Sequence, residues 1–196
     1  MDDNSFWQLI KNNDDIFKNL EDEIRDLLLE FGTSVPCNRF DIGNVIELII
    51  YTFLTKIGLV VIKLPNAKRV DLDIKDYKKI SIKYSSKGDI TLHNSNSSIN
   101  KDEKMTDLIL LTPIKMYLIT NTSLNKYNIN LTKYLVNKGD SLKLKRSILT
   151  EMDKQKYPHN ININIVVDKK KCKNRLCYEL FYIAYKEDYN KRNSTV

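Results

Sequence analysis

Two pairs of polar residues stand out because each pair is spaced by two positions within a short apolar segment. Asp71 and Asp73 form the first pair, and Ser81 and Lys83 form the second. Alternate residues of a β-strand share one face of a sheet. A hairpin of the two segments therefore places all four side chains on one face, and Glu47 can reach that face from the segment before it.

This set of residue types fits the hydrolysis of a phosphodiester bond. Carboxylate oxygens are the ligands that Mg²⁺ prefers in proteins. The ion polarises a phosphate and lowers the pKa of a bound water, while a neighbouring lysine orients that water or stabilises developing charge. The pattern predicts Mg²⁺ ligands at Asp71, Glu47 and Asp73, with either aspartate as the principal one, and a catalytic lysine at Lys83.

Glu47 separates this hypothesis from a simpler one. Aspartates and lysines in a hairpin usually form a solvated face, but Glu47 lies in a segment that is apolar on almost every side. A buried carboxylate is rare without a partner, which favours a metal ion or Lys83 beside it. The alternative is a structural acid that pairs with a basic side chain away from the sheet.

The elements that would position these residues begin with two helical regions. Apolar residues recur with the helical period over 5–31, where Asn12–Asp15 predicts a break and Gly32 an end. A second helix is predicted over 41–56, with Asp41 as its N-cap and Gly58 after its end. Its nearly uniform apolar surface indicates that it packs in the core.

Strands are predicted next, and the fold class follows from their order. The predicted strands are 59–64, 70–74, 80–84, 90–92, 107–111, 116–120, 161–167 and 176–185, with a turn over 75–79 and a helix over 142–156. This order predicts an α/β (α+β) fold with a central mixed β-sheet flanked by helices. We expect a single domain over 1–196, with an N-terminal helical segment (1–40), a catalytic core (41–120) and a C-terminal part of open role (121–196).

Composition restricts the partners. The net charge of +7 and the isoelectric point of about 9.1 favour a polyanion such as nucleic acid or an anionic membrane. The three cysteines are an odd number, which favours free thiols over a disulfide framework. The sequence shows neither a signal peptide nor a membrane-length apolar run, so we expect a cytoplasmic protein.

The hairpin residues, taken with Glu47, resemble the PD-(D/E)XK nuclease superfamily. The run ISIKYSSKGDITLHN (80–94) is especially similar to type II restriction endonucleases, and the resemblance covers roughly 41–120. It implies a restriction-endonuclease-like fold with Asp71 as metal ligand and catalytic residue, Lys83 as the motif lysine, and Glu47 as the helix acid. Ser81 departs from the pattern, since it stands where the family usually has Asp or Glu.

The resemblance also implies an activity and partners. It implies Mg²⁺-dependent, sequence-specific cleavage of double-stranded DNA by a homodimer, with a cognate DNA methyltransferase possible in the same system. Phosphate contacts are expected at Arg69, Tyr84, Ser85, Ser86 and Lys87, because guanidinium, hydroxyl and ammonium groups commonly bind phosphate; a plain strand exit is the alternative. Two other functions stay open: a non-catalytic DNA-binding protein that kept the fold, and a repair or junction nuclease.

Overall fold

The computed structural model describes residues 1–32, 35, 37–64, 70–94, 106–138, 141–168, 174–178, 180–183 and 185–186. Three helices open the chain: α1 (Asp3–Lys11), α2 (Asp14–Glu30) and α3 (Asn38–Lys56). The predicted break between the first two is confirmed. None of the described helices is both long and apolar enough to cross a lipid bilayer.

The start and the end of α3 have different causes. The helix begins at Asn38, so the predicted N-cap at Asp41 is wrong. The buried side chain of Asn38 donates to the carbonyl of Asn174 at 2.8 Å and accepts from the N–H of Leu176 at 2.9 Å. Tertiary contacts therefore fix this helix start. The end follows local rules: Gly58 has a φ of +91°, the region that favours glycine.

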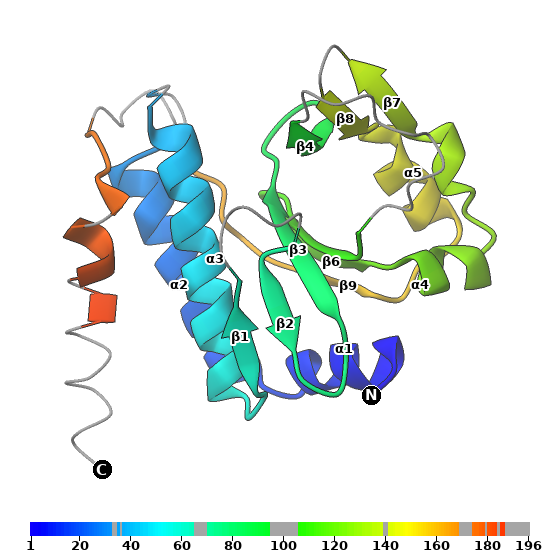
Figure 1. Cartoon of the computed structure of the whole chain (residues 1–196), viewed down its shortest axis with the longest axis horizontal. Helices are drawn as coiled ribbons and strands as arrows, with labels where there is room; N and C mark the ends of the chain where they lie inside the picture. Colours follow the sequence, from blue (N-terminus) through cyan, green and yellow to red (C-terminus); the bar gives the residue numbers. More distant parts are fainter. Residues whose placement is uncertain are drawn as a thin grey trace.

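A six-stranded mixed sheet forms the centre of the molecule (Figure 1). Its order is β1 (Val61–Lys63), β2 (Leu72–Ile74), β3 (Lys79–Tyr84), β5 (Leu108–Leu111), β6 (Lys115–Ile119) and β9 (Asn160–Asn162). The β3–β5 pair is parallel, and the other neighbouring pairs are antiparallel. The predicted mixed α/β architecture with helices flanking the sheet is confirmed.

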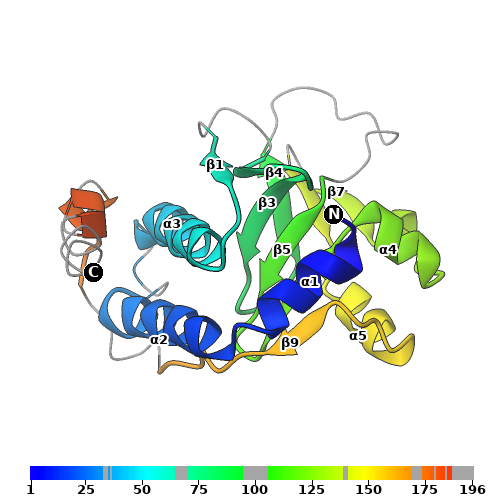
Figure 2. The ribbon, with the colours of Figure 1, turned by 90° about the horizontal axis from the view of Figure 1, so that it is seen from below.

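The two faces of the sheet carry separate hydrophobic clusters. In β5, Ile109 and Leu111 pack into the cluster formed with α1, α2 and α3, whereas Leu108 and Leu110 pack into a second cluster. The second cluster is covered by α4 (Asn121–Lys126) and α5 (Ser147–Lys154). Viewed from below, α2 and α3 lie on one side of the sheet and α4 and α5 on the other (Figure 2). Alternate residues of one strand thus contribute to the two different clusters.

The C-terminal third departs most from the predictions. The segment predicted as a helix over 142–156 divides into β8 (Ser141–Leu144) and α5. Strand β8 pairs with β4 (Ile90–Asn94) on one side and with β7 (Leu135–Lys138) on the other, which forms a second, antiparallel sheet. Alternating Leu142 and Leu144 are buried, which is a strand pattern. The strand predicted over 161–167 is shorter in the structure, where β9 ends at Asn162.

The predicted strand over 176–185 is also wrong, because the described residues from Tyr178 onward are helical. The amide of Phe181 donates to the carbonyl of Cys177, four residues earlier. Tyr178 stacks on Tyr182 and Phe181 stacks on Tyr185, with ring centroids 5.9 Å apart in both pairs. Aromatic residues favour strands in general, but here the spacing of four places them on one helical face.

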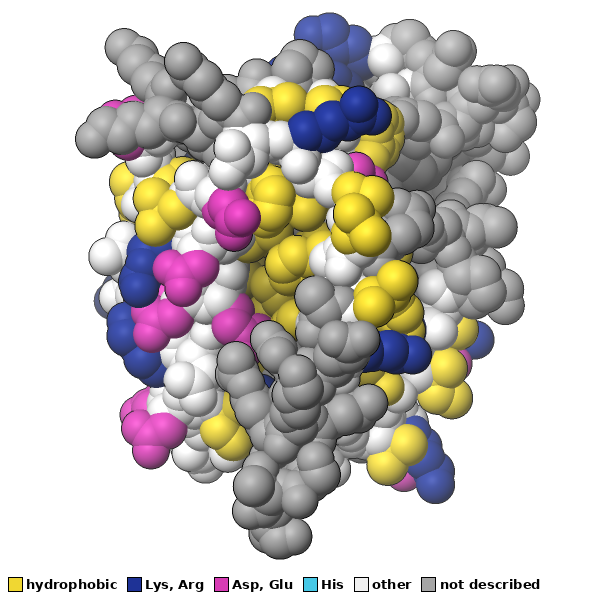
Figure 3. Space-filling view, turned by 90° about the vertical axis from the view of Figure 1, so that its left-hand side faces the viewer, with side chains coloured by type: hydrophobic (Ala, Val, Ile, Leu, Met, Phe, Trp, Pro, Cys, Tyr) yellow, Lys and Arg dark blue, Asp and Glu magenta, His cyan; other side chains and the backbone are white. Residues whose placement is uncertain are grey.

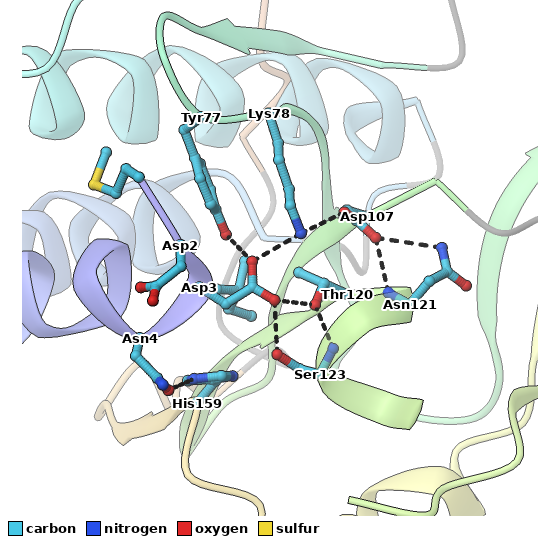
Figure 4. A network of polar contacts seen from close by, with 12 residues as sticks. Asp2, Asp3, Asn4, Tyr77, Lys78, Asp107, Thr120, Asn121, Ser123 and His159 are labelled. Carbon is cyan, nitrogen blue, oxygen red and sulfur yellow. Dashed lines mark hydrogen bonds and ion pairs between the residues drawn. The ribbon is translucent and has the colours of Figure 1, made fainter. Parts of the chain in front are cut away.

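A buried polar network ties the N-terminal helix to the far end of the sheet (Figure 4). The carboxylate of Asp3 accepts hydrogen bonds from the hydroxyls of Tyr77, Thr120 and Ser123, and it pairs with the ammonium of Lys78 at 2.8 Å. Lys78 also lies 3.1 Å from Asp107. Burial alone would raise the pKa of Asp3, but these hydrogen bonds outweigh it and hold the pKa well below its usual range.

We expect Asp3→Asn to lower the free energy of unfolding at pH 7 by about 2 kcal/mol, because a buried charged acceptor is lost. A depressed folded-state pKa stabilises the fold above the unfolded value of 3.8 and loses that effect as the pH falls below it. The difference from wild type should therefore shrink between pH 7 and pH 3 in urea denaturation. Asp153→Asn, in an exposed pair with Lys115, is the control and should cost under about 1 kcal/mol. Equal losses in both variants would contradict this account.

Candidate active site

Asp71 lies in the bend directly before β2, and its carboxylate is fastened to β3. Its Oδ2 accepts hydrogen bonds from the hydroxyl of Ser81 at 2.8 Å and from the backbone N–H of Ile82 at 2.6 Å. Within the described part of the chain, Oδ1 has no hydrogen-bond partner. One oxygen is thus held in place, and the other is not hydrogen-bonded to a described residue.

Lys83 follows Ser81 by two residues on β3, as the strand period predicts. Its Nζ lies 4.0 Å from Oδ2 of Asp71, at the limit of an ion pair, and its side chain is 26% exposed. The ammonium group therefore keeps access to solvent and to a bound substrate beside the fixed carboxylate.

Glu47 reaches the same place from α3. Its side chain is only 13% exposed, and its Oε2 lies 3.8 Å from Nζ of Lys63. Its pKa is raised to about 7: burial is the largest cause, the charge of Asp71 adds to the rise, and Lys63 and Lys83 offset part of it. These interactions show that the carboxylate lies within electrostatic reach of Asp71 and Lys83, so the structure brings together the three residues that the sequence singled out.

Lys63 is a member of this group that the sequence did not indicate. It is the last residue of β1, and besides its contact with Glu47 it donates to the phenol oxygen of Tyr178 at 3.3 Å. A lysine at a strand end is ordinary on its own. Only the β1–β2 register, which pairs Lys63 with Leu72 next to Asp71, reveals its position.

Asp73 takes a different position from Asp71. It pairs across the strands with Lys79, whose Nζ lies 3.4 Å from its carboxylate. The residues that the structure describes contain no group of three or more His, Cys, Asp or Glu side chains suited to a metal ion. Of the two candidate aspartates, Asp71 contacts Ser81 on β3 and its charge acts on Glu47, whereas Asp73 pairs with Lys79.

Ser81 supports Asp71 instead of standing beside it as a third oxygen ligand. The side chain is 4% exposed, and its hydroxyl hydrogen is directed to the Asp71 carboxylate. The residue that departs from the family pattern thus positions the aspartate.

An open cleft of about 680 Å³ begins at this group of residues. Its lining includes Glu47 and Lys83 and continues through the four residues expected to contact phosphate: Tyr84, Ser85, Ser86 and Lys87. Lys87 is exposed, whereas Ser85 is buried and donates to the carbonyl of Lys87 at 3.2 Å. Burial raises the pKa of Tyr84 to about 12, so its phenol stays protonated. The expected contact at Arg69 lies outside the described residues.

The basic residues near 143–146 lie in a strand and at the start of a helix. Lys143 belongs to β8, and Arg146 precedes α5. The N–H of Arg146 donates to Asp89 at 3.1 Å, and its guanidinium donates to the carbonyl of Ser85 at 3.4 Å. Arg146 thus holds the turn that forms one wall of the cleft.

The donor set suits a hard cation. Glu47 and Asp71 offer oxygen atoms only, and Oδ1 of Asp71 is not engaged by a described residue, which fits Mg²⁺ better than a metal that prefers nitrogen or sulfur. Comparisons with family models, with curated proteins and with solved structures find no match for this chain. The resemblance to PD-(D/E)XK nucleases therefore depends on these residues and their arrangement alone.

Proposed function

We propose that this chain is a metal-dependent DNA endonuclease whose active site consists of Glu47, Asp71 and Lys83. The observation that carries the proposal is that Glu47 and Lys83 line one cleft, while Asp71 lies 4.0 Å from Lys83 and within electrostatic reach of Glu47. A buried acid with a raised pKa beside a second carboxylate and a lysine is typical of a catalytic site.

Each residue has a role that its surroundings support. Glu47 and Asp71 would hold Mg²⁺, which when bound supplies charge stabilisation and lowers the pKa of water. Lys83 lies where its ammonium can stabilise negative charge on a phosphate. Ser81 and the N–H of Ile82 keep the Asp71 carboxylate oriented, and Lys63 stays near Glu47.

The distribution of charge supports a polyanion at the cleft. Arg39, Lys83 and Lys87 line the cleft. By contrast, the sequence of α2 is rich in acids, and acidic side chains gather along one side of the face shown in Figure 3. Phosphates are repelled by such a surface, so we assign DNA to the cleft.

A restriction-type enzyme is the finer version of this proposal. It would cut both strands of a specific site as a homodimer, since a two-fold protein matches a palindromic duplex, and a methyltransferase would protect the host's own sites. A non-catalytic DNA-binding protein is the second candidate. Ser81 favours it, because the described site has two carboxylates where a third would be usual.

We expect DNA cleavage to require Mg²⁺ or Mn²⁺, and Ca²⁺ to support binding without cutting. Only oxygen ligands are available from Glu47 and Asp71, and such sites take hard cations. Genome-length unmodified DNA is the appropriate substrate, since it contains any short recognition sequence many times. Incubation with each ion, and with chelator, followed by gel analysis checks this. Equal cutting in excess chelator would contradict the proposal.

A further inference from the structure

The cleft extends well beyond the candidate catalytic residues, toward the N-terminal end of α3. Arg39, Phe40, Asn44 and Glu47 all line it. The spacings of four and three residues place Phe40, Asn44 and Glu47 along one side of the helix, and Arg39 directly precedes Phe40. Phe40 precedes Glu47 by seven residues, or about 10 Å along the axis. A stacked strand covers this length in about three nucleotides at ~3.4 Å each.

Phe40 is unusual in its exposure. Its side chain is 77% exposed, the highest value among the large hydrophobic residues that the structure describes. A phenyl ring left in water forgoes the stabilisation that burial would supply. A single exposed apolar residue is ordinary, but this one is aromatic and lies in a cleft that also contains cationic side chains. An aromatic face stacks on any nucleobase.

The cations lie on both walls of the cleft. Arg39 comes from α3, whereas Lys83 and Lys87 come from β3 and the turn after it. The acid on the same turn, Asp89, accepts a hydrogen bond from the N–H of Arg146 and so is directed into the turn's own structure. This arrangement offers phosphate contacts on either side of a strand whose base reaches Phe40.

The size of the cleft limits what can enter. About 680 Å³ falls within the roughly 300–1,000 Å³ of pockets that enclose a single small ligand. It suits a short single-stranded segment, whereas the major groove alone of a duplex is about 12 Å wide. A base that must enter such a space leaves the stack, as in enzymes that act on unpaired or flipped nucleotides.

We propose that the cleft binds the cut strand in unpaired form, with one base stacked on Phe40 and its phosphates on Arg39 and Lys87. This inference rests on the proposed nuclease function and names the state of the DNA that the site accepts: single-stranded, frayed or locally opened. The opening of a stable duplex would then oppose binding.

The test measures binding by fluorescence anisotropy in Ca²⁺, with a labelled single-stranded oligonucleotide, the same sequence as a blunt duplex, and a duplex with an unpaired end. Wild type should bind the single strand and the unpaired end more tightly than the blunt duplex. Phe40→Ala should weaken single-strand binding about fivefold or more, while Phe40→Trp should keep it. Ile114→Ala, which removes another exposed hydrophobic side chain (62% exposed), is the matched control.

Three outcomes separate this inference from the function that it depends on. If Phe40→Ala binds the single strand as tightly as wild type, or if the blunt duplex binds best, the inference is wrong and the nuclease proposal stands. If wild type binds none of the three DNAs, the inference is wrong, and cleavage of genome-length DNA in Mg²⁺ then decides the proposed function separately. Because Phe40 is so exposed, its replacement should leave the thermal stability unchanged, which circular dichroism checks.

Discussion

Replacing Lys83 by alanine is expected to lower the rate of DNA cleavage at least about 100-fold, the scale seen when a preorganised group that stabilises transition-state charge is removed. DNA binding in Ca²⁺ should fall far less, since other cations line the cleft. Thermal stability should hardly change, because Nζ is 4.0 Å from Asp71 and partly exposed, and such pairs contribute little. Cleavage is measured in single-turnover assays on genome-length DNA.

Lys79→Ala is the matched control for this variant. Lys79 lies at the start of the same strand, its side chain is 59% exposed, and it pairs with Asp73 instead of Asp71. Removing the same positive charge there should leave the cleavage rate within about twofold of wild type, because rim charges act mainly on association. A Lys83→Ala enzyme that cuts at nearly the wild-type rate would remove this lysine from the active site.

The second large effect is expected for Glu47→Gln, and it depends on pH. The pKa of Glu47 is raised from 4.5 to about 7, so between these values the folded protein binds more protons than the unfolded chain. Stability therefore falls as the pH rises through this window, by about 3 kcal/mol in total at ~1.4 kcal/mol per pKa unit. Glutamine carries no charge to lose, so the variant should be about as stable as wild type at pH 4.5 and more stable at pH 8 in metal-free buffer.

Activity should change in the opposite direction to stability. Glutamine keeps the shape but removes an anionic ligand, and we expect a loss of at least about tenfold in cleavage rate, or about 1.4 kcal/mol. Urea denaturation at both pH values and the cleavage rate are measured on one preparation, with Glu151→Gln on α5 as a surface control. A variant that is less stable at pH 8 yet cuts at the wild-type rate would make Glu47 a structural acid.

The sequence predicted the candidate site better than it predicted the rest of the chain. Strand alternation placed Ser81 and Lys83 correctly, and one acid in an apolar helix singled out Glu47. The same alternation could not choose between Asp71 and Asp73, because Asp71 lies in a bend before the strand. The backbone of Asp71 still pairs with Ile80 and Leu64, and its side chain adds a contact to the N–H of Ile82. Periodicity carries no information about such a side-chain contact.

Residues that depend on long-range packing could not be predicted. Lys63 joins the site through the pairing of β1 with β2, and Tyr178 meets it from a segment 115 residues later. The aromatic segment around Tyr178 was predicted as a strand because propensity favours one, yet its residues stack at a spacing of four. Tertiary contacts override weak local preferences of this kind.

The central claim is that Glu47 and Asp71 form one metal site, and metal binding tests it without knowledge of any recognition sequence. The direct measurement is a titration of Mn²⁺ into the DNA-free protein at pH 8, followed by the paramagnetic signal of the free ion. We predict saturable binding to wild type and to Lys83→Ala, and its loss in a Glu47→Gln, Asp71→Asn double variant that circular dichroism shows to be folded. Undiminished binding in that double variant, or no binding to wild type, would contradict the account.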